Sequence, residues 1–173
     1  MVDFLIIGPY NAITYNEVFP LFKDDVISLG VSRRGMSFIN NDVKINSRWF
    51  SNLVHPEPGP LTLKKGGEYR KFDNYDVINI DRISDIPSDY DGLMGVPVSF
   101  LDVWNPEQFE LIGFPGIGIV PEGWKGMTED FIKLYYEQGN TGCYEVGKKM
   151  GYFVKDGKAI IPYVRLLIKK KIS

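Results

Sequence analysis

Cysteine and histidine are almost absent from this chain of 173 residues, which contains only Cys143 and His55. A single cysteine excludes an internal disulfide and any zinc site built from several cysteines, and it fits a reducing compartment. Neither residue lies in a recognisable nucleophile context, so we predict no catalytic pair between them. Runs of about 18 apolar residues are also missing, which argues against a membrane-spanning helix. We therefore expect a cytoplasmic protein without a membrane partner.

A strong excess of positive charge is missing as well, since 20 Lys and Arg residues stand against 22 Asp and Glu residues. The net charge of -2 excludes a uniformly basic surface that wraps DNA, but it allows a local basic patch. The hydrophobic fraction of 44% is that of a globular protein with a substantial core. Aromatic residues make up 14%, and we assign most of them to core and strand packing.

The most informative segment is the apolar run Phe4-Leu5-Ile6-Ile7-Gly8. A wholly apolar strand is typical of the middle of a parallel sheet, where both of its faces are buried. Only Met1-Val2-Asp3 comes before it, so the strands that would flank it are not among the preceding residues. We therefore expect the second part of a larger fold. One edge of this strand should be unpaired and apolar, which favours aggregation, dimerisation or a complementing half.

Alternating helical and extended patterns predict a mixed α/β chain. A helix is expected from Thr14 to Phe22, with Thr14 as its cap and Pro20 as an interruption. A strand at Val26–Val31 would complete a strand-helix-strand unit of the kind that builds parallel sheets. A second, amphipathic helix is expected over Met127–Gln138. Further strands are expected at Gly35–Ile39, Arg48–Leu53, Tyr75–Ile80, Phe109–Gly113 and Pro162–Ile168, with a hairpin turn at Lys155–Lys158.

Composition changes after residue 53, where prolines and glycines become frequent. We accordingly divide the chain into two parts, which can still form one compact domain. Residues 1–53 are expected to be the second half of an α/β sheet. Residues 54–173 are expected to be a region rich in strands and loops that packs on it and faces a ligand.

Two short segments match known motifs only in part. Phe114-Pro115-Gly116-Ile117-Gly118 follows an expected strand and has the form of an S-adenosylmethionine loop, but it continues into Pro121 rather than into a helix. Asn105-Pro106-Glu107-Gln108 begins like the N-P-P-F box of amino-methyltransferases, yet it lacks the second proline and the aromatic residue. We favour ordinary turns for both segments.

Charged residues gather in two groups. The acidic group, Asp85, Asp89 and Asp91, matches no metal-binding loop, so we predict turns there and no metal site. The basic group falls on expected turns and strand edges, and it consists of Arg33, Arg34, Arg48, Lys64, Lys65, Arg70 and Lys71. A solvated surface is the usual fate of such residues. If they share one face, they suit contacts to phosphates.

Ordered blocks along nearly the whole chain resemble the EcoRI-type adenine-specific DNA methyltransferases. The first blocks are Phe4-Leu5-Ile6-Ile7-Gly8, Asn11-Ala12-Ile13-Thr14-Tyr15, Glu17, Phe19-Pro20-Leu21, Leu29-Gly30, Trp49-Phe50-Ser51-Asn52-Leu53 and Asp73-Asn74-Tyr75-Asp76. The strongest are Asp85-Ile86-Pro87, Asp89-Tyr90-Asp91-Gly92, Met94-Gly95-Val96-Pro97, Phe100-Leu101-Asp102, Asn105-Pro106 and Gln108-Phe109-Glu110. The last are Gly123-Trp124, Gly126-Met127, Tyr135-Tyr136, Gln138-Gly139-Asn140-Thr141-Gly142, Gly157-Lys158, Pro162-Tyr163 and Arg165.

The resemblance implies transfer of a methyl group from S-adenosylmethionine to the exocyclic amino group of adenine in duplex DNA. In such enzymes the N-P-P-F box lies just before the strand that matches Phe4 to Gly8, and it binds the flipped adenine. This sequence starts after that box and after the cofactor-binding segment. We therefore assign no catalytic residue and expect neither cofactor binding nor methyl transfer by the chain alone. The implied fold is α/β: the C-terminal half of a Rossmann-like methyltransferase sheet with an added lobe rich in strands and loops.

The resemblance also suggests where ligands would lie. Asn11, Thr14 and Tyr15 follow the carboxyl end of a strand, where ligands of open α/β sheets bind, so we expect them near the target base or the cofactor. A helix cap and turn is the alternative role. Asn52, His55 and the basic group are the expected contacts to DNA. The expected partners are double-stranded DNA and either an N-terminal methyltransferase half or a second copy joined through the strand edge.

Two other functions stay open. One is a non-enzymatic DNA-binding module, whose affinity would depend on salt but not on a cofactor. The other is a small enzyme that uses Gly116 to Gly118 as its own cofactor loop and binds S-adenosylmethionine without help.

Overall fold

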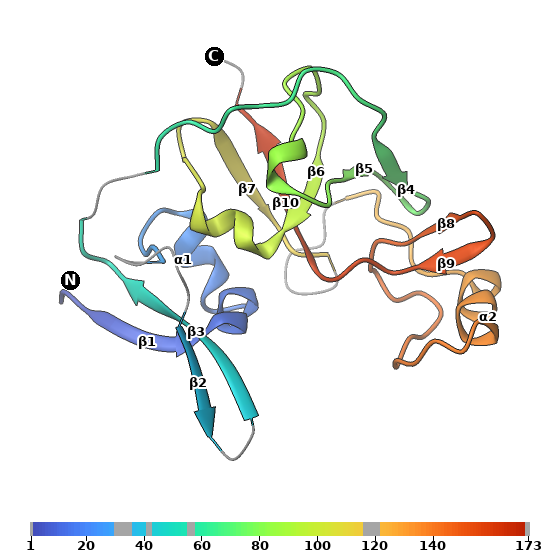
Figure 1. Ribbon diagram of the computed structural model, residues 1–173, viewed down its shortest axis with the longest axis horizontal. Coiled ribbons are helices and arrows are strands. Elements are labelled where there is room, and N and C mark those ends of the chain that lie inside the picture. The colour runs from blue at the N-terminus through green and yellow to red at the C-terminus, as the bar shows by residue number, and fades with distance from the viewer. Residues whose placement is uncertain (1, 30–35, 41–42, 55–57, 116–121, 172–173) are drawn as a thin grey trace.

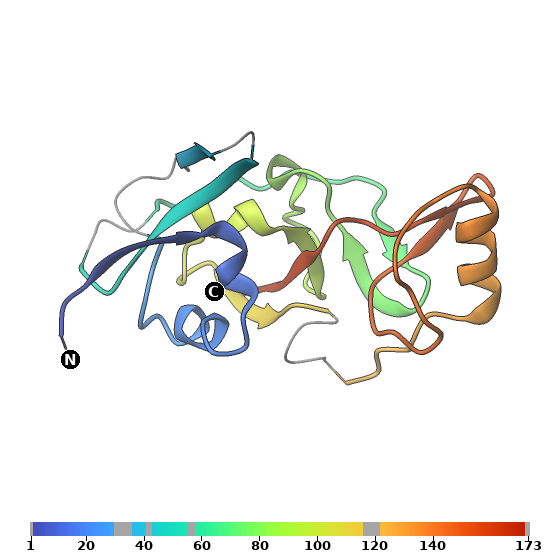
Figure 2. The same cartoon turned by 90° about the horizontal axis from the view of Figure 1, so that it is seen from below.

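The structure is a computed structural model that describes residues 2–29, 36–40, 43–54, 58–115 and 122–171. Three groups of elements follow one another across the molecule (Figure 1). A small sheet with a short helix lies at one end, a five-stranded sheet lies in the middle, and a helix with a hairpin lies at the other end. Figure 2 shows the same order from below, with β1 and α2 at opposite ends.

The small sheet contains the apolar N-terminal run. Its strands are β1 (Leu5–Pro9), β2 (Met36–Asn40) and β3 (Val43–Ser51). Their order is β1-β3-β2, and both pairings are antiparallel. The prediction of a buried strand within a parallel sheet is therefore wrong for this chain, since β1 has an exposed surface. The expected free edge is present in the described part of the chain, because β1 pairs with β3 on one side only.

The segment after β1 differs from the predicted strand-helix-strand unit. A 3-10 helix, η1 (Tyr10–Thr14), and a five-residue helix, α1 (Phe19–Lys23), replace the single helix expected from Thr14 to Phe22. Pro20 stands in the first turn of α1, where its missing N–H has no intrahelical partner to lose, so it starts the helix instead of interrupting it. In the described part of the expected strand at Val26–Val31, Ser28 forms one antiparallel bridge with Ser51. The predicted parallel unit is thus wrong.

The central sheet carries many of the buried residues. Its strands are β4 (Arg70–Phe72), β5 (Tyr75–Asn79), β6 (Met94–Pro97), β7 (Phe109–Gly113) and β10 (Arg165–Lys170). They are ordered β4-β5-β6-β10-β7, and β5 with β6 is the parallel pair. The 3-10 helices η2 (Ile83–Asp85) and η3 (Val98–Asp102) connect them. The strands expected at Tyr75–Ile80 and Phe109–Gly113 are confirmed.

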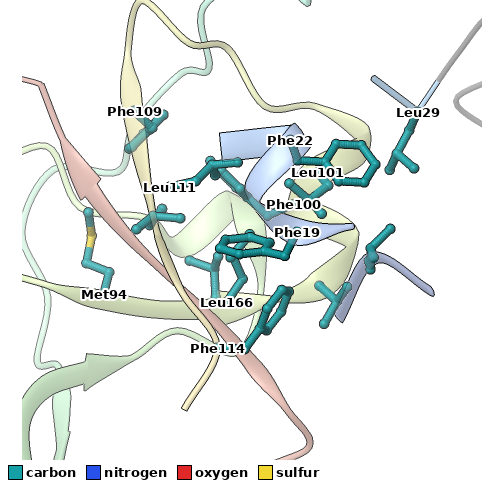
Figure 3. Close-up of a cluster of buried hydrophobic side chains, with 14 of the residues drawn as sticks. Phe19, Phe22, Leu29, Met94, Phe100, Leu101, Phe109, Leu111, Phe114 and Leu166 are labelled. Carbon is teal, nitrogen blue, oxygen red and sulfur yellow. The ribbon is translucent and has the colours of Figure 1, made fainter. Parts of the chain in front are cut away.

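One hydrophobic cluster joins the small sheet to the central sheet (Figure 3). Phe19 meets Phe114 edge to face at 4.9 Å between ring centroids. Phe22 meets Phe50 of β3 in the same way at 5.9 Å. The cluster continues into the sheet through Leu166, which is fully buried. Since its members come from both sides of residue 53, the two parts suggested by the sequence share one core.

The remaining elements form a satellite at the far end. Helix α2 (Glu129–Glu137) is capped by Thr128, whose side chain accepts a hydrogen bond from the N–H of Phe131. The hairpin of β8 (Phe153–Lys155) and β9 (Lys158–Ile160) turns at Asp156 and Gly157, whose φ angles are +50° and +73°. Two positive φ angles favour Asp-Gly at this turn. The predicted helix cap and hairpin are both confirmed.

The chain is therefore a mixed α/β protein with several sheets and few helices. A Rossmann-like sheet is not visible in it, because antiparallel pairs dominate both larger sheets. None of the helices in the described ranges has the length and apolar character needed to cross a membrane.

Replacing Phe22 by alanine tests the contact between α1 and the sheets. Phe22 is 1% exposed, so Phe22→Ala leaves a cavity and should lower the free energy of unfolding by about 3–5 kcal/mol. Leu21→Ala in the same helix is the matched control, because Leu21 is 40% exposed and its loss should cost less than about 1 kcal/mol. Urea unfolding followed by tryptophan fluorescence measures both values. Equal losses would contradict the described packing of α1.

Candidate functional site

The end of β1 leads directly into the three residues expected near a target base. Thr14 uses its hydroxyl within η1, where it donates to the carbonyl oxygen of Asn11 at 2.8 Å. The side chains of Asn11 and Tyr15 are exposed, and Tyr15 retains 48% of its accessible surface. Ile13 points the other way and is fully buried. The turn thus presents an amide and a phenol ring to solvent at the carboxyl end of β1.

Beside this turn, Arg48 of β3 is held in a pair with Asp102. Its Nε and Nη2 atoms donate to the two carboxylate oxygens of Asp102, each at 3.2 Å. The guanidinium also lies over the ring of Tyr10 at 4.2 Å. Only 14% and 15% of the two charged side chains remain exposed. Arg48, expected to contact DNA, therefore uses its charge to fasten β3 to η3 and η1.

Tyr10 has an unusual environment. Its Oη atom is buried, and it has no hydrogen-bond partner among the described residues. Burial is the main cause that raises the pKa of Tyr10 well above its ordinary value, and the carboxylate of Asp102 adds to the increase against the opposing effect of Arg48. The phenol therefore stays protonated at neutral pH. It can donate a hydrogen bond but cannot serve as a base.

Asn52 has a structural role in the described conformation. Its Oδ1 atom accepts from the N–H of Phe4 at 2.8 Å, and its Nδ2 atom donates to the carbonyl of Val2 at 3.0 Å. The hydroxyl of Ser51 donates to the carbonyl of Phe4 at 2.9 Å. These three bonds hold the start of β1 against the end of β3. The side chain that was expected to face DNA is occupied by the backbone of its own chain.

The described members of the basic group do not form one uncompensated face. Lys64 pairs with Asp85 at 3.3 Å, Arg70 pairs with Asp73 at 3.8 Å, and Lys71 pairs with Asp76. Lys65 is exposed next to Lys64. Arg48 belongs to the small sheet, whereas Lys64 lies beside Pro87 and Arg70 begins β4. Carboxylates therefore lie beside four of the five described members of this basic group, which weakens their field toward phosphates.

The remaining candidates either lie outside the described residues or form an ordinary turn. Arg33, Arg34, His55 and the Gly116–Gly118 loop fall outside the described residues. Asn105 makes an ordinary turn, in which its side chain donates to the carbonyl of Pro58 and accepts from the N–H of Glu107.

Each of the three aspartates of the acidic group interacts with a different residue. Asp85 pairs with Lys64, Asp89 accepts from Tyr69, and Asp91 pairs with Lys170 at 2.8 Å. No cluster of three metal-ligating side chains occurs within the described ranges.

Sequence reasoning missed Tyr10 and Asp102 as neighbours of Arg48. Asp102 lies 54 residues from Arg48, and no local spacing links the two. The one available signal was the block Phe100-Leu101-Asp102, which resembles the family although it carries no evident chemistry. Its buried pair with arginine now supplies a structural reason for the aspartate.

Comparisons with known proteins point to the same family as the sequence resemblance. The family model described as adenine-specific methyltransferase EcoRI matches residues 36–171. The type II methyltransferase M.EcoRI of Escherichia coli is 44% identical over 97% of this chain and 50% of its own length. The type II methyltransferase M.MgeORF184P of Mycoplasma genitalium is 35% identical over 64% of the chain and 44% of its own length. M.MpnI of Mycoplasma pneumoniae is 34% identical over 64% of the chain and 43% of its own length. No solved structure matches the chain. The chain thus spans half or slightly less of these relatives.

Replacing Asp102 by asparagine should show how much the stability of the fold depends on the pair between Arg48 and Asp102. The substitution leaves a largely buried guanidinium without its counter-charge, which should cost about 3 kcal/mol of folding free energy. Asp76→Asn is the matched control, since Asp76 is 82% exposed in its pair with Lys71 and should contribute less than about 1 kcal/mol. Chemical unfolding at pH 7 measures both. A loss for Asp102→Asn no larger than the control would contradict the buried pair.

Tyr10→Phe should remove part of the alkaline sensitivity of the fold. A pKa raised by folding gives stability that is complete below the unfolded value of about 10 and is lost as the pH rises further. Tyr10→Phe should therefore lose less stability than the wild type between pH 10 and pH 12. At pH 7 it should be no less stable, because the removed hydroxyl has no partner. Unfolding midpoints at pH 7 and at pH 12 measure the stability of Tyr10→Phe relative to the wild type. Tyr15→Phe is the control, since Tyr15 is exposed. A loss of stability of Tyr10→Phe at pH 7 would refute the prediction.

Proposed function

Because the chain belongs to the family of the adenine-specific methyltransferase EcoRI, we propose that it forms part of an enzyme that methylates the exocyclic amino group of adenine in duplex DNA. The observation that carries this proposal is 44% identity over 97% of the chain to one type II methyltransferase. The methyl donor would be S-adenosylmethionine, and the enzyme would belong to a restriction-modification system. We propose a cytoplasmic location as part of the same role, since the matched relatives come from bacteria.

We infer that the described residues do not form a cofactor site of their own. The hollow beside the ends of β1 and β3, lined in part by Asp25, Ser28 and Asn52, has a volume of about 200 Å³. Typical sites for ligands of this class occupy about 300–1,000 Å³. A wider hollow of about 440 Å³ is lined by Cys143, Glu145, Val146, Gly147 and Lys148, none of which carries an aromatic ring that could stack on adenine. These residues do not fit the cofactor, and we assign its binding to other parts of the enzyme.

The role we propose for this part is to position DNA and complete the sheet. Asn11 and Tyr15 are exposed at the carboxyl end of β1, where an amide and an aromatic ring suit contacts to a base. Lys65 is an exposed candidate for a phosphate contact. An N-P-P-F sequence does not occur among the 173 residues, which is why we place the transfer chemistry outside them.

The isolated chain should transfer no methyl group. Purified protein incubated with duplex DNA and labelled S-adenosylmethionine should give no N6-methyladenine above the level without protein. Calorimetric titration with S-adenosylmethionine alone should likewise give no binding heat. N6-methyladenine formed by the chain alone would contradict the proposal that the transfer chemistry lies outside these residues. Binding of S-adenosylmethionine without methyl transfer would favour the alternative of a small enzyme with its own cofactor loop.

Co-expression with the remaining residues of the Escherichia coli relative is the positive arm of the same experiment. Methylated adenine in host DNA is expected there and not with either polypeptide alone. DNA binding that falls with salt but never leads to methylation would instead favour the non-enzymatic binding module.

A further inference from the structure

Tyr163 lies in the segment that leads from β9 back to β10 in the middle of the molecule (Figures 1 and 2). It is 79% exposed, more than any other aromatic residue that the structure describes, since Tyr15 is 48% and Tyr136 is 39% exposed. A single exposed hydrophobic residue is normal and assigns no role by itself. The surroundings of the ring show whether it is a loose surface group or a prepared contact.

The backbone on both sides of Tyr163 is packed. Ile161 packs against the cluster that contains Met127 in the satellite, and Val164 packs against the cluster shared by the two larger sheets. Between them, Pro162 has a fixed φ angle and restricts the residue before it to extended conformations. The ring of Tyr163 is therefore held in solvent by a backbone with little freedom.

The first residue of β10 adds a further anchor. The Nε atom of Arg165 donates to Oδ1 of Asn79, and its Nη2 atom donates to Oδ1 of Asp81, each at 2.9 Å. Only 13% of the arginine side chain is exposed. Because Tyr163 precedes this fixed residue by two positions, a ligand on its ring has little backbone left to order, which lowers the entropic cost of binding.

Tyr163 also lies close to Tyr10, the residue that begins η1. Burial is the largest cause of the raised pKa of Tyr10, and the Asp102 carboxylate and the Tyr163 phenol add to the increase. Electrostatic effects of this kind weaken with distance, so the two phenols are near each other. The exposed ring of Tyr163 thus stands near the turn that presents Asn11 and Tyr15 to solvent.

The hollow beside Tyr163 does not admit a base. It is lined in part by Phe72, Tyr163 and Arg165 and has a volume of about 10 Å³, which is room for no more than about one water molecule. A flat ligand can therefore use only the outer face of the ring. A rigidly held aromatic ring with one free face is the kind of group on which nucleobases stack.

We propose that Tyr163 stacks on an unstacked base of the DNA strand next to the target adenine. The inference rests on the DNA substrate proposed above. Every base has a π face, so such stacking accepts all four bases, and Tyr163 adds affinity without reading sequence. An enzyme that turns adenine out of the duplex disturbs the stacking of its neighbours, which supplies a base of this kind. The adenine itself belongs to the N-P-P-F box, which does not occur among these residues.

A protein partner is the competing occupant of this ring. The cores of protein interfaces are clusters, in which aromatic anchors are surrounded by other apolar contacts. The residues beside Tyr163 are already partly buried in the chain itself: Ile161, Pro162 and Val164. This segment therefore offers one free ring face instead of an apolar patch, which suits a base better than a protein surface.

The test measures the binding of short single strands by the purified chain. An oligothymidylate of about 12 nucleotides is compared with an abasic phosphodiester of the same length, which carries the same charge but no bases. The wild type should bind the oligothymidylate at least about fivefold more tightly than the abasic strand. Tyr163→Ala should remove this preference and leave the affinity for the abasic strand unchanged. Tyr163→Phe keeps the ring and should bind within about twofold of the wild type.

Tyr136→Ala is the matched control, since Tyr136 is the exposed tyrosine of α2 at the far end of the molecule. It should leave the binding of both strands unchanged. Tyr163→Ala should remain folded because it changes an exposed side chain, and circular dichroism of each variant checks this.

Two results would overturn the proposal directly. One is a wild type that shows no preference for the oligothymidylate, and the other is a preference that Tyr163→Ala retains. A loss that Tyr163→Ala shows with an oligoadenylate but not with the oligothymidylate would also overturn it, because the ring would then serve adenine itself.

Co-expression with the remaining residues of the Escherichia coli relative separates this inference from the proposed function. If the two polypeptides methylate adenine and Tyr163→Ala leaves both the rate and the KM for DNA unchanged, the function stands and the inference falls. If the chain shows the preference for bases but co-expression never gives methylated adenine, the inference stands and the function falls.

Discussion

Packing of α1 between the two larger sheets is the contact on which the remaining arrangement depends. Phe19 and Phe22 stand three residues apart, so they project from neighbouring positions on one helix. Phe19 meets Phe114, beyond β7 of the central sheet (Figure 3). Phe22 meets Phe50 of β3. Because β3 is positioned by this contact, β1 is positioned as well. A five-residue helix has little stability of its own, and burial of its two rings accounts for its presence.

The same packing decides what the polar groups can do. Once β3 lies beside η3, Arg48 reaches Asp102 and Tyr10, and its charge is paired within the fold. Asn52 is similarly taken up by the backbone of β1. Two side chains that look like DNA contacts in the sequence thus hold β1 and β3 in place within the described fold. Asn11 and Tyr15 remain exposed, whereas Ile13 between them is fully buried.

Patterns confined to a few residues were read correctly from the sequence. The Thr128 cap, the Asp156-Gly157 turn and the alternation of Phe109–Gly113 each depend on neighbours within one turn or one strand. Predictions that depended on distant partners did less well. Thr14 was taken for a helix cap although its hydroxyl closes a 3-10 turn. The direction of strand pairing was wrong because an apolar run shows that a strand is suited to burial, not which neighbour it finds.

The sequence alone determined the family, the positions of several strands and the apolar character of Phe4 to Gly8, since residue type and order are sufficient for these. Tertiary structure decided the rest. It paired β1 antiparallel with β3, joined residues on both sides of position 53 in one core, and gave Arg48 a partner 54 residues away. The physical reason is that such pairings are selected by the summed burial and hydrogen bonding of the whole chain. No local segment contains enough information to determine them. An apolar strand indicates that burial suits it, and only the assembled fold shows that the described residues pair one edge of β1 and leave its other edge unpaired.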